Sequence, residues 1–208
     1  MIKIPEFITK SEFLFHIYEK VVQFIPKVNW GTGTLTSTQK VQIAEKLASN
    51  YYIILVADGN RLSSFLISIM TLFATGQWGK YTHALMNCDY MDSVEDIDKF
   101  KFVEATASGV HYSTFDEVFS TATKVCLLRP SNVVDWTPVI DSLVKEVGLP
   151  YDDLFDLSTK NKLSCVEVVF DAFEESEFPR LKQDIKDHNT LTPQMFRETP
   201  DLVVEYEV

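Results

Sequence analysis

The sequence predicts an α+β fold in which a largely antiparallel sheet packs on helices. Runs typical of β-strands lie beside helical runs without regular βαβ alternation along the chain. Hydrophobic residues make up 46% of the 208 residues and charged residues 24%, so the chain is able to bury a sizeable core. This composition excludes a disordered tail protein, a collagen-like fibre and a disulfide-stapled miniprotein.

The chain divides into an N-terminal helical extension over residues 1–50 and a main domain over residues 51–208. Apolar side chains recur at helical spacing in residues 10–25, and residues 36–49 predict a second helix. Fewer than about fifty residues bury little surface alone, so we expect these helices to cover the main domain. The candidate capping residues are Ser11 for the first helix and Thr36 or Ser37 for the second.

Strands and helices of the main domain follow from composition and periodicity. Runs rich in β-branched and aromatic residues predict strands at residues 51–57, 78–87, 100–106, 109–115, 124–130 and 201–208. Helical periodicity predicts helices at residues 61–76, 115–122, 136–148 and 163–175, the third of them closed by Gly148. No internal repeat or low-complexity tract interrupts this series.

Charge and apolar segments exclude two classes of partner. The net charge is −11, from 19 basic and 30 acidic residues, so the chain repels phosphate backbones and anionic membrane surfaces. The most apolar stretch, residues 65–76, spans roughly 18 Å as a helix, well short of a ~30 Å hydrocarbon core. We therefore expect no nucleic-acid partner and no transmembrane segment.

The cysteines indicate a cellular compartment. Cys88, Cys126 and Cys165 are odd in number and do not make a disulfide framework. Residues 1–20 lack the apolar core and the cleavage site of a signal peptide. We therefore expect reduced thiols in the cytoplasm.

Cys165 lies where the helix predicted over residues 163–175 begins. Unpaired backbone N–H groups and the helix dipole at that end favour negative charge, which lowers the pKa of a thiol and can stabilise an oxyanion. The alternative is that Cys165 is a small buried hydrophobic residue, as cysteine often is.

A thiolate nucleophile needs a base, and His83 lies on the strand predicted at residues 78–87. Glu104, on a neighbouring strand run, is flanked by Val103 and Ala105, where an unpaired charge would be costly. Both residues also fit structural roles. His83 could be a hydrogen-bonded histidine of the core, and Glu104 could be the carboxylate of a buried ion pair. The other histidines are His16, His111 and His188.

Several short motifs occur in the order found in a known family. They are Tyr81-Thr82-His83, then Phe102-Val103-Glu104-Ala105 with Gly109-Val110, then residues 150–156 (PYDDLFD), then Cys165-Val166-Glu167-Val168-Val169. In these motifs residues 51–208 resemble the permuted papain-like cysteine hydrolases, specifically the YiiX-like branch of the NlpC superfamily. The resemblance implies a papain-like, circularly permuted NlpC-type fold for this part of the chain.

Carried over residue by residue, the resemblance implies Cys165 as nucleophile, His83 as base and Glu104 as the group that orients the imidazole. Tyr151, from its motif, and Ser164, beside the nucleophile, are candidate substrate or oxyanion contacts. Tyr151 is equally compatible with burial for packing.

The resemblance further implies hydrolysis of an amide or ester bond through an acyl-enzyme, on a peptide, a peptidoglycan fragment or an amino acid joined to a lipid. We expect no cofactor and no metal, because His83, Cys88 and His111 lack the second closely spaced ligand pair of a metal site. The apolar run at residues 65–73 could shape an acyl pocket, although a core helix is the favoured alternative. Two other functions stay open: thiol-dependent acyl transfer, and a non-catalytic binding module on the same fold.

Overall fold

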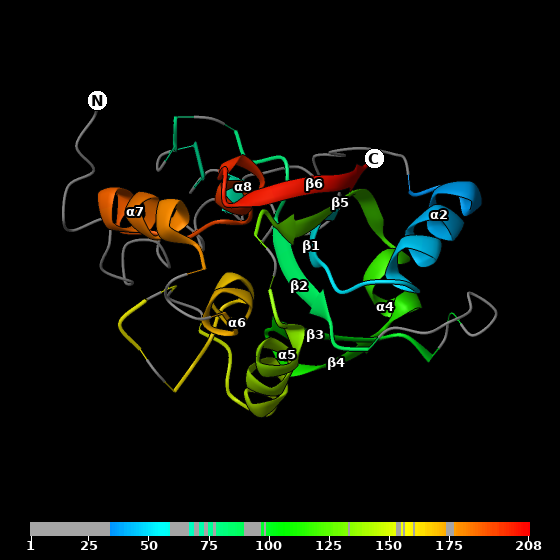
Figure 1. Cartoon of the computed structure of the whole chain (residues 1–208), viewed down its shortest axis with the longest axis horizontal. Helices are drawn as coiled ribbons and strands as arrows, with labels where there is room; N and C mark the ends of the chain where they lie inside the picture. The colour runs from blue at the N-terminus through cyan, green and yellow to red at the C-terminus, as the bar shows by residue number, and fades with distance from the viewer. Residues whose placement is uncertain are drawn as a thin grey trace, which may run out of the picture.

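A computed structural model gives the arrangement of the chain (Figure 1). The predicted helix at residues 10–25 and its candidate cap Ser11 lie outside the residues that the structure describes. The described residues are 34–58, 67–68, 71–72, 75–76, 78–89, 97, 99–132, 134–152, 155, 157–159, 161–173 and 177–208.

A six-stranded sheet forms the centre of the molecule, in the order β4-β3-β2-β1-β5-β6, and each neighbouring pair is antiparallel. The predicted α+β class with an antiparallel sheet is therefore confirmed. The strands are β1 (Ile53–Asp58), β2 (His83–Asn87), β3 (Lys101–Thr106), β4 (Gly109–Thr114), β5 (Ala122–Pro130) and β6 (Leu202–Glu207).

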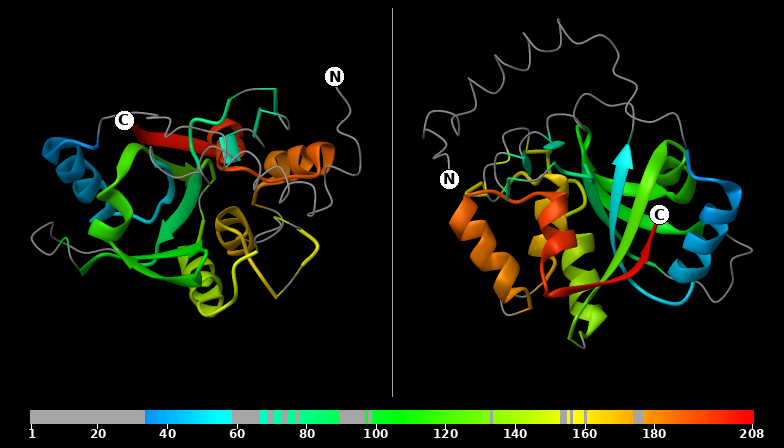
Figure 2. Two further views of the ribbon diagram at one scale, coloured as in Figure 1. Left: turned by 180° about the vertical axis from the view of Figure 1, so that it is seen from behind. Right: turned by 90° about the horizontal axis from the view of Figure 1, so that it is seen from above.

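Helices cover both faces of this sheet, as the two further views show (Figure 2). Along β1, Ile53 and Leu55 belong to one apolar cluster, whereas Ile54 and Val56 belong to the other, so the central strand is buried on both sides. One face carries α5 (Trp136–Lys145), α6 (Cys165–Asp171), α7 (Pro179–His188) and α8 (Pro193–Glu198). The opposite face carries α2 (Ser37–Leu47) and α4 (Phe115–Phe119).

Helix α2, predicted over residues 36–49, is capped by Thr36, whose hydroxyl accepts a hydrogen bond from the backbone N–H of Gln39. Its apolar side chains lie in the same cluster as those of the sheet, and Ile43 and Leu47 are fully buried there. Residues 34–50 therefore share a hydrophobic core with the main domain.

Helices α7 and α8 lie where the sequence predicts no helix. Helix α7 begins at Pro179 and is followed by Asn189 in the left-handed conformation (φ 51°). Leu181 is buried and Ile185, one turn later, packs on the same cluster, so the apolar stripe of this otherwise polar helix is only two residues long. The strand expected at residues 78–87 is shorter than predicted, because it begins only at His83.

Three elements position the candidate site. Helix α6 packs on β2 and β3, with Val166 and Val169 in the same cluster as Ala84 and Met86. This packing brings the beginning of α6 toward the strands that carry His83 and Glu104. Among the described residues, no helix combines the length and the apolar character that crossing a membrane requires.

Candidate active site

Cys165 is the first residue of α6, as the sequence predicts, and it is 1% exposed. Ser164 is the N-cap, and its backbone N–H donates a 2.8 Å hydrogen bond to the carboxylate of Glu167 in a capping box. This local pattern explains why the helix begins here and why the sulfur lies at the end of the helix rather than along its side.

His83 stands at the beginning of β2 and links two other groups. Its Nε2 lies 2.5 Å from Oε2 of Glu104, and the side chain of Cys165 is the other group that acts on the ring. Burial alone lowers the pKa of His83, but the hydrogen bonds and charges of Cys165 and Glu104 outweigh it and raise the pKa to about 10. His83 is therefore a charged imidazolium beside the carboxylate of Glu104.

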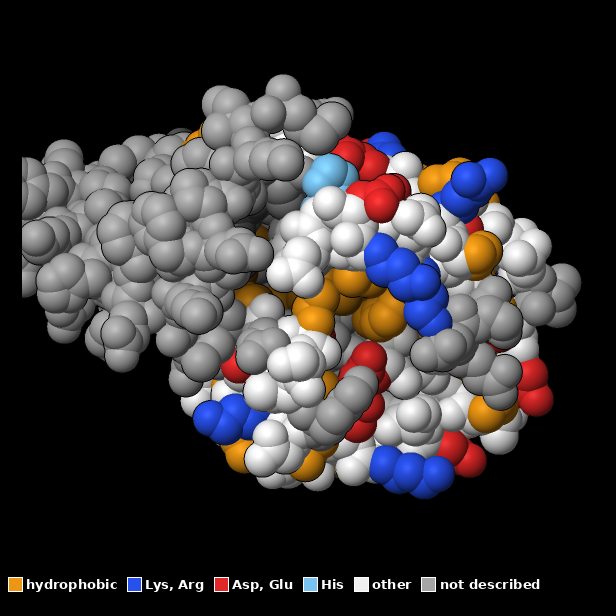
Figure 3. Space-filling model, turned by 90° about the vertical axis from the view of Figure 1, so that its left-hand side faces the viewer, with side chains coloured by type: hydrophobic (Ala, Val, Ile, Leu, Met, Phe, Trp, Pro, Cys, Tyr) orange, Lys and Arg blue, Asp and Glu red, His pale blue; other side chains and the backbone are white. Residues whose placement is uncertain are grey.

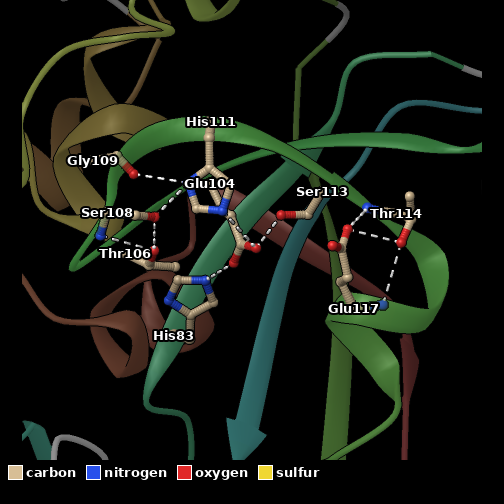
Figure 4. Close-up of polar contacts among 9 residues, drawn as sticks. All are labelled: His83, Glu104, Thr106, Ser108, Gly109, His111, Ser113, Thr114 and Glu117. Atoms are coloured by element: carbon tan, nitrogen blue, oxygen red, sulfur yellow. Dashed lines mark hydrogen bonds and ion pairs between the residues drawn. The ribbon is translucent and has the colours of Figure 1, made fainter.

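Glu104 lies in the middle of β3 and is held by three side chains (Figure 4). The hydroxyl of Ser113 donates to Oε1, and Nε2 of His111 lies 3.7 Å from the same oxygen. Burial raises the pKa of this carboxyl, but His83, with the help of Ser113 and His111, lowers it to about 2. The group is therefore a carboxylate of fixed orientation across the physiological pH range.

Ser113 and His111 were not predicted as site residues from the sequence. The pairing of two neighbouring strands could have predicted both. Strands β3 and β4 form a hairpin that pairs Thr106 with Gly109 and hence Glu104 with His111. Gly109 adopts a φ of 97°, which permits the tight turn at this corner. Counting outward from that turn would have placed His111 opposite Glu104 and Ser113 two residues further along.

The other two cysteines have surroundings that oppose ionisation. Burial and the charge of Asp89 raise the pKa of Cys88 to about 11. Burial and the charge of Glu207 raise the pKa of Cys126 to about 12. Of the three thiols, only Cys165 has an imidazole as a hydrogen-bond partner among the residues described.

A small depression adjoins Cys165, with a cavity volume of about 10 Å³, which is room for about one water molecule. The face that carries α6 and α7 is hollowed, and apolar side chains gather in the hollow between basic and acidic ones (Figure 3). With Cys165, the side chains that line the depression are Ile67, Phe155, Val166, Leu191, Thr192 and Pro193.

The structure places Tyr151 and Ser164 next to this depression rather than in its wall. The ring of Tyr151 packs edge-on against Phe155, with 6.2 Å between centroids. Ser164 is 1% exposed at the N-cap of α6. Tyr151 thus reaches the depression through Phe155, and direct contact of either residue with a substrate stays a prediction.

No group of three or more histidine, cysteine, aspartate or glutamate side chains suited to a metal ion occurs in the described part of the chain. Comparison of the sequence with protein-family models and with curated proteins, and of the structure with solved structures, found no match. No known protein therefore supports the grouping of Cys165, His83 and Glu104, which rests on the 2.5 Å contact of His83 with Glu104 and on the effect of Cys165 on the pKa of His83.

Proposed function

We propose that this chain is a cysteine hydrolase of amide or ester bonds, with Cys165 as nucleophile, His83 as general base and acid, and Glu104 as the orienting carboxylate. The observation that carries the proposal is the His83 imidazole, which hydrogen-bonds Glu104 on one side and Cys165 on the other. The permuted papain-like fold and a location in the cytoplasm belong to the same proposal, and the free thiols support the second.

The reaction has two balanced halves. The Cys165 thiolate attacks the substrate carbonyl carbon, a C–S bond forms, and the C–N or C–O bond to the leaving group breaks as His83 gives that group its proton. A water molecule then attacks the thioester while His83 accepts a proton from it. The acid is released, and the thiolate and the imidazolium are restored.

Each supporting residue has an electrostatic task in this scheme. Glu104 favours the imidazolium and fixes the orientation of the ring through Nε2. Ser113 and His111 contact the second oxygen of the carboxylate, which keeps Glu104 ionised and prevents it from rotating away from His83.

The test is pre-steady-state hydrolysis of p-nitrophenyl acetate, followed by mass spectrometry of the trapped protein. We expect a burst of one nitrophenol per chain and an acetyl group on Cys165, since acylation precedes hydrolysis. Cys165→Ala should abolish the burst, whereas Cys88→Ala should leave it unchanged. A burst that persists in Cys165→Ala would refute the proposal, and acetyl transfer to an added amine in place of water would identify an acyltransferase.

A further inference from the structure

Residues 148–152, which we call the linking segment, lie against the corner of the β3–β4 hairpin. The N–H of Val110 donates a hydrogen bond to the carbonyl of Leu149, and the carbonyl of Val110 accepts one from the N–H of Gly148, both at 2.8 Å. Val110 lies on β4, which pairs with β3, the strand that carries Glu104. One end of the linking segment is therefore held in a fixed position relative to the orienting carboxylate.

The other end of the linking segment holds the chain just before α6. The N–H of Leu163 donates a hydrogen bond to the carbonyl of Pro150 at 3.1 Å, and the carbonyl of Leu163 accepts one from the N–H of Asp152 at 3.2 Å. Leu163 is buried and lies two residues before Cys165. The acceptors at the two ends, Leu149 and Pro150, are neighbours in the chain, and the ring of Pro150 fixes its φ. A displacement at the hairpin is therefore passed on to the beginning of α6.

Gly109 allows the linking segment to lie this close to the hairpin. It stands at the corner of the hairpin that carries Glu104 and His111 (Figure 4). A Cβ atom on Gly109 would lie 2.6 Å from the carbonyl oxygen of Leu149, whereas Cβ contacts under 3.0 Å essentially never occur. Because that oxygen belongs to the backbone, it cannot rotate away as the end of a side chain can. Any larger residue at position 109 therefore displaces the linking segment or the turn.

The contact between Cys165 and His83 depends on where α6 begins. Burial lowers the pKa of His83, and the hydrogen bond with Cys165 is the largest of the effects that raise it to about 10. Hydrogen bonds weaken steeply when their atoms separate or lose alignment. The protonation of His83 is therefore a measure of the position of Cys165.

We propose that the linking segment sets the position of Cys165 relative to His83, and that Gly109 is a positioning residue for the nucleophile. This inference rests on the proposed cysteine hydrolase, and it assigns a role to residues outside the proposed triad. Packing of α6 on β2 and β3 holds the helix as a whole, whereas the linking segment holds the backbone immediately before its first turn.

Gly109→Ala tests the proposal, because it adds one methyl group where the linking segment lies. We expect the titration midpoint of the His83 ring, followed by nitrogen-15 NMR, to fall by about 1 pH unit, since the hydrogen bond with Cys165 is weakened. The burst of nitrophenol from p-nitrophenyl acetate should slow about 10-fold to 100-fold, as for a nucleophile misplaced by up to about 1 Å.

Gly76→Ala is the matched control for backbone strain. Gly76 has a φ of 75°, and nothing lies within 4 Å of the position of its Cβ. Alanine there carries the strain of a positive φ without the collision. This variant should lose stability but keep the wild-type His83 midpoint and the wild-type burst.

The Cys165→Ala background shows which partner of His83 has moved. Without the sulfur, a displaced α6 has no hydrogen bond with His83 to weaken, so Gly109→Ala should leave the midpoint unchanged there. An effect transmitted through Glu104 would instead lower the midpoint in both backgrounds.

Pro150→Gly is the second variant, and it decides the question if Gly109→Ala does not fold. It keeps both carbonyl acceptors and removes the rigid ring that separates them. Because Pro150 is exposed, no core contact is lost. The His83 midpoint should again fall when Cys165 is present and stay the same in Cys165→Ala.

Two results would overturn this inference alone. One is an unchanged His83 midpoint in folded Gly109→Ala, or in Pro150→Gly where the first variant does not fold. The other is an equal fall with and without Cys165. In either case, a midpoint that is lower in Cys165→Ala than in the wild type would leave the proposed hydrolase standing. The same midpoint in Cys165→Ala and in the wild type would overturn the hydrolase and this inference together.

Discussion

Replacing Glu104 by Gln removes one negative charge beside His83 and keeps the size of the side chain. The carboxyl pKa moves from 4.5 to about 2 on folding, and each pKa unit corresponds to about 1.4 kcal/mol. The ionised form is therefore stabilised by roughly 3 kcal/mol in the folded protein. We expect Glu104→Gln to lower the free energy of unfolding at neutral pH by up to that amount.

In the proposed mechanism the same charge stabilises the imidazolium that pairs with the Cys165 thiolate. Because about 1.4 kcal/mol corresponds to a factor of ten, loss of the charge should slow alkylation of Cys165 by iodoacetamide between 10-fold and about 100-fold at neutral pH. Rates are measured by peptide mass spectrometry between about pH 5 and pH 9, with urea unfolding on the same samples. Glu117→Gln is the control, because Glu117 is a nearby exposed carboxylate in the cap of α4. A destabilised Glu104→Gln protein with an unaltered alkylation profile would show that Glu104 is only a structural ion-pair partner.

Three further predictions concern acid stability, the thiols and the N-terminal helix. Because the folded pKa of Glu104 lies below its unfolded value, its contribution is complete above about pH 4.5 and is lost as the pH falls toward 2. The difference in unfolding free energy between wild type and Glu104→Gln should therefore shrink over that range, and an equal difference at pH 3 and pH 6 would contradict this. Iodoacetamide at neutral pH should label Cys165 before the other two cysteines, whose pKa values burial raises to about 11 and about 12, and earlier labelling of either would remove Cys165 from the site. Ile43→Ala should cost about 2–5 kcal/mol in urea unfolding, whereas Val41→Ala on the exposed side of α2 should cost little, and equal small losses would show that α2 is not part of the core.

Apolar periodicity in the sequence was sufficient to predict the sheet and most of its helices. Strand β1 is a continuous apolar run because both of its faces are buried, and α2 shows its Thr36 cap in the sequence. Helix α7 carries only a two-residue apolar stripe, Leu181 and Ile185, and leaves most of its surface to solvent, so periodicity marks it weakly. Pro179 and Asn189 at its two ends were the available signals.

The residues of the site differ in how far the sequence reveals them. Cys165 could be placed from the local pattern of a helix start, whereas the roles expected for His83 and Glu104 came from the resemblance to a known family, because strand position alone is weak evidence. His111 and Ser113 contact Glu104 only because of the register of the β3–β4 hairpin, and nothing in their immediate sequence marks them as site residues.

The proposed function depends on one imidazole that is shared between a thiolate and a carboxylate. Nitrogen-15 NMR of the His83 ring, followed across pH, measures its protonation directly. We predict that both ring nitrogens are protonated at neutral pH, with a titration midpoint near the pKa of about 10, and that Cys165→Ala lowers this midpoint by removing the thiolate. A wild-type His83 that is neutral above about pH 7, with the same midpoint in Cys165→Ala, would contradict the account.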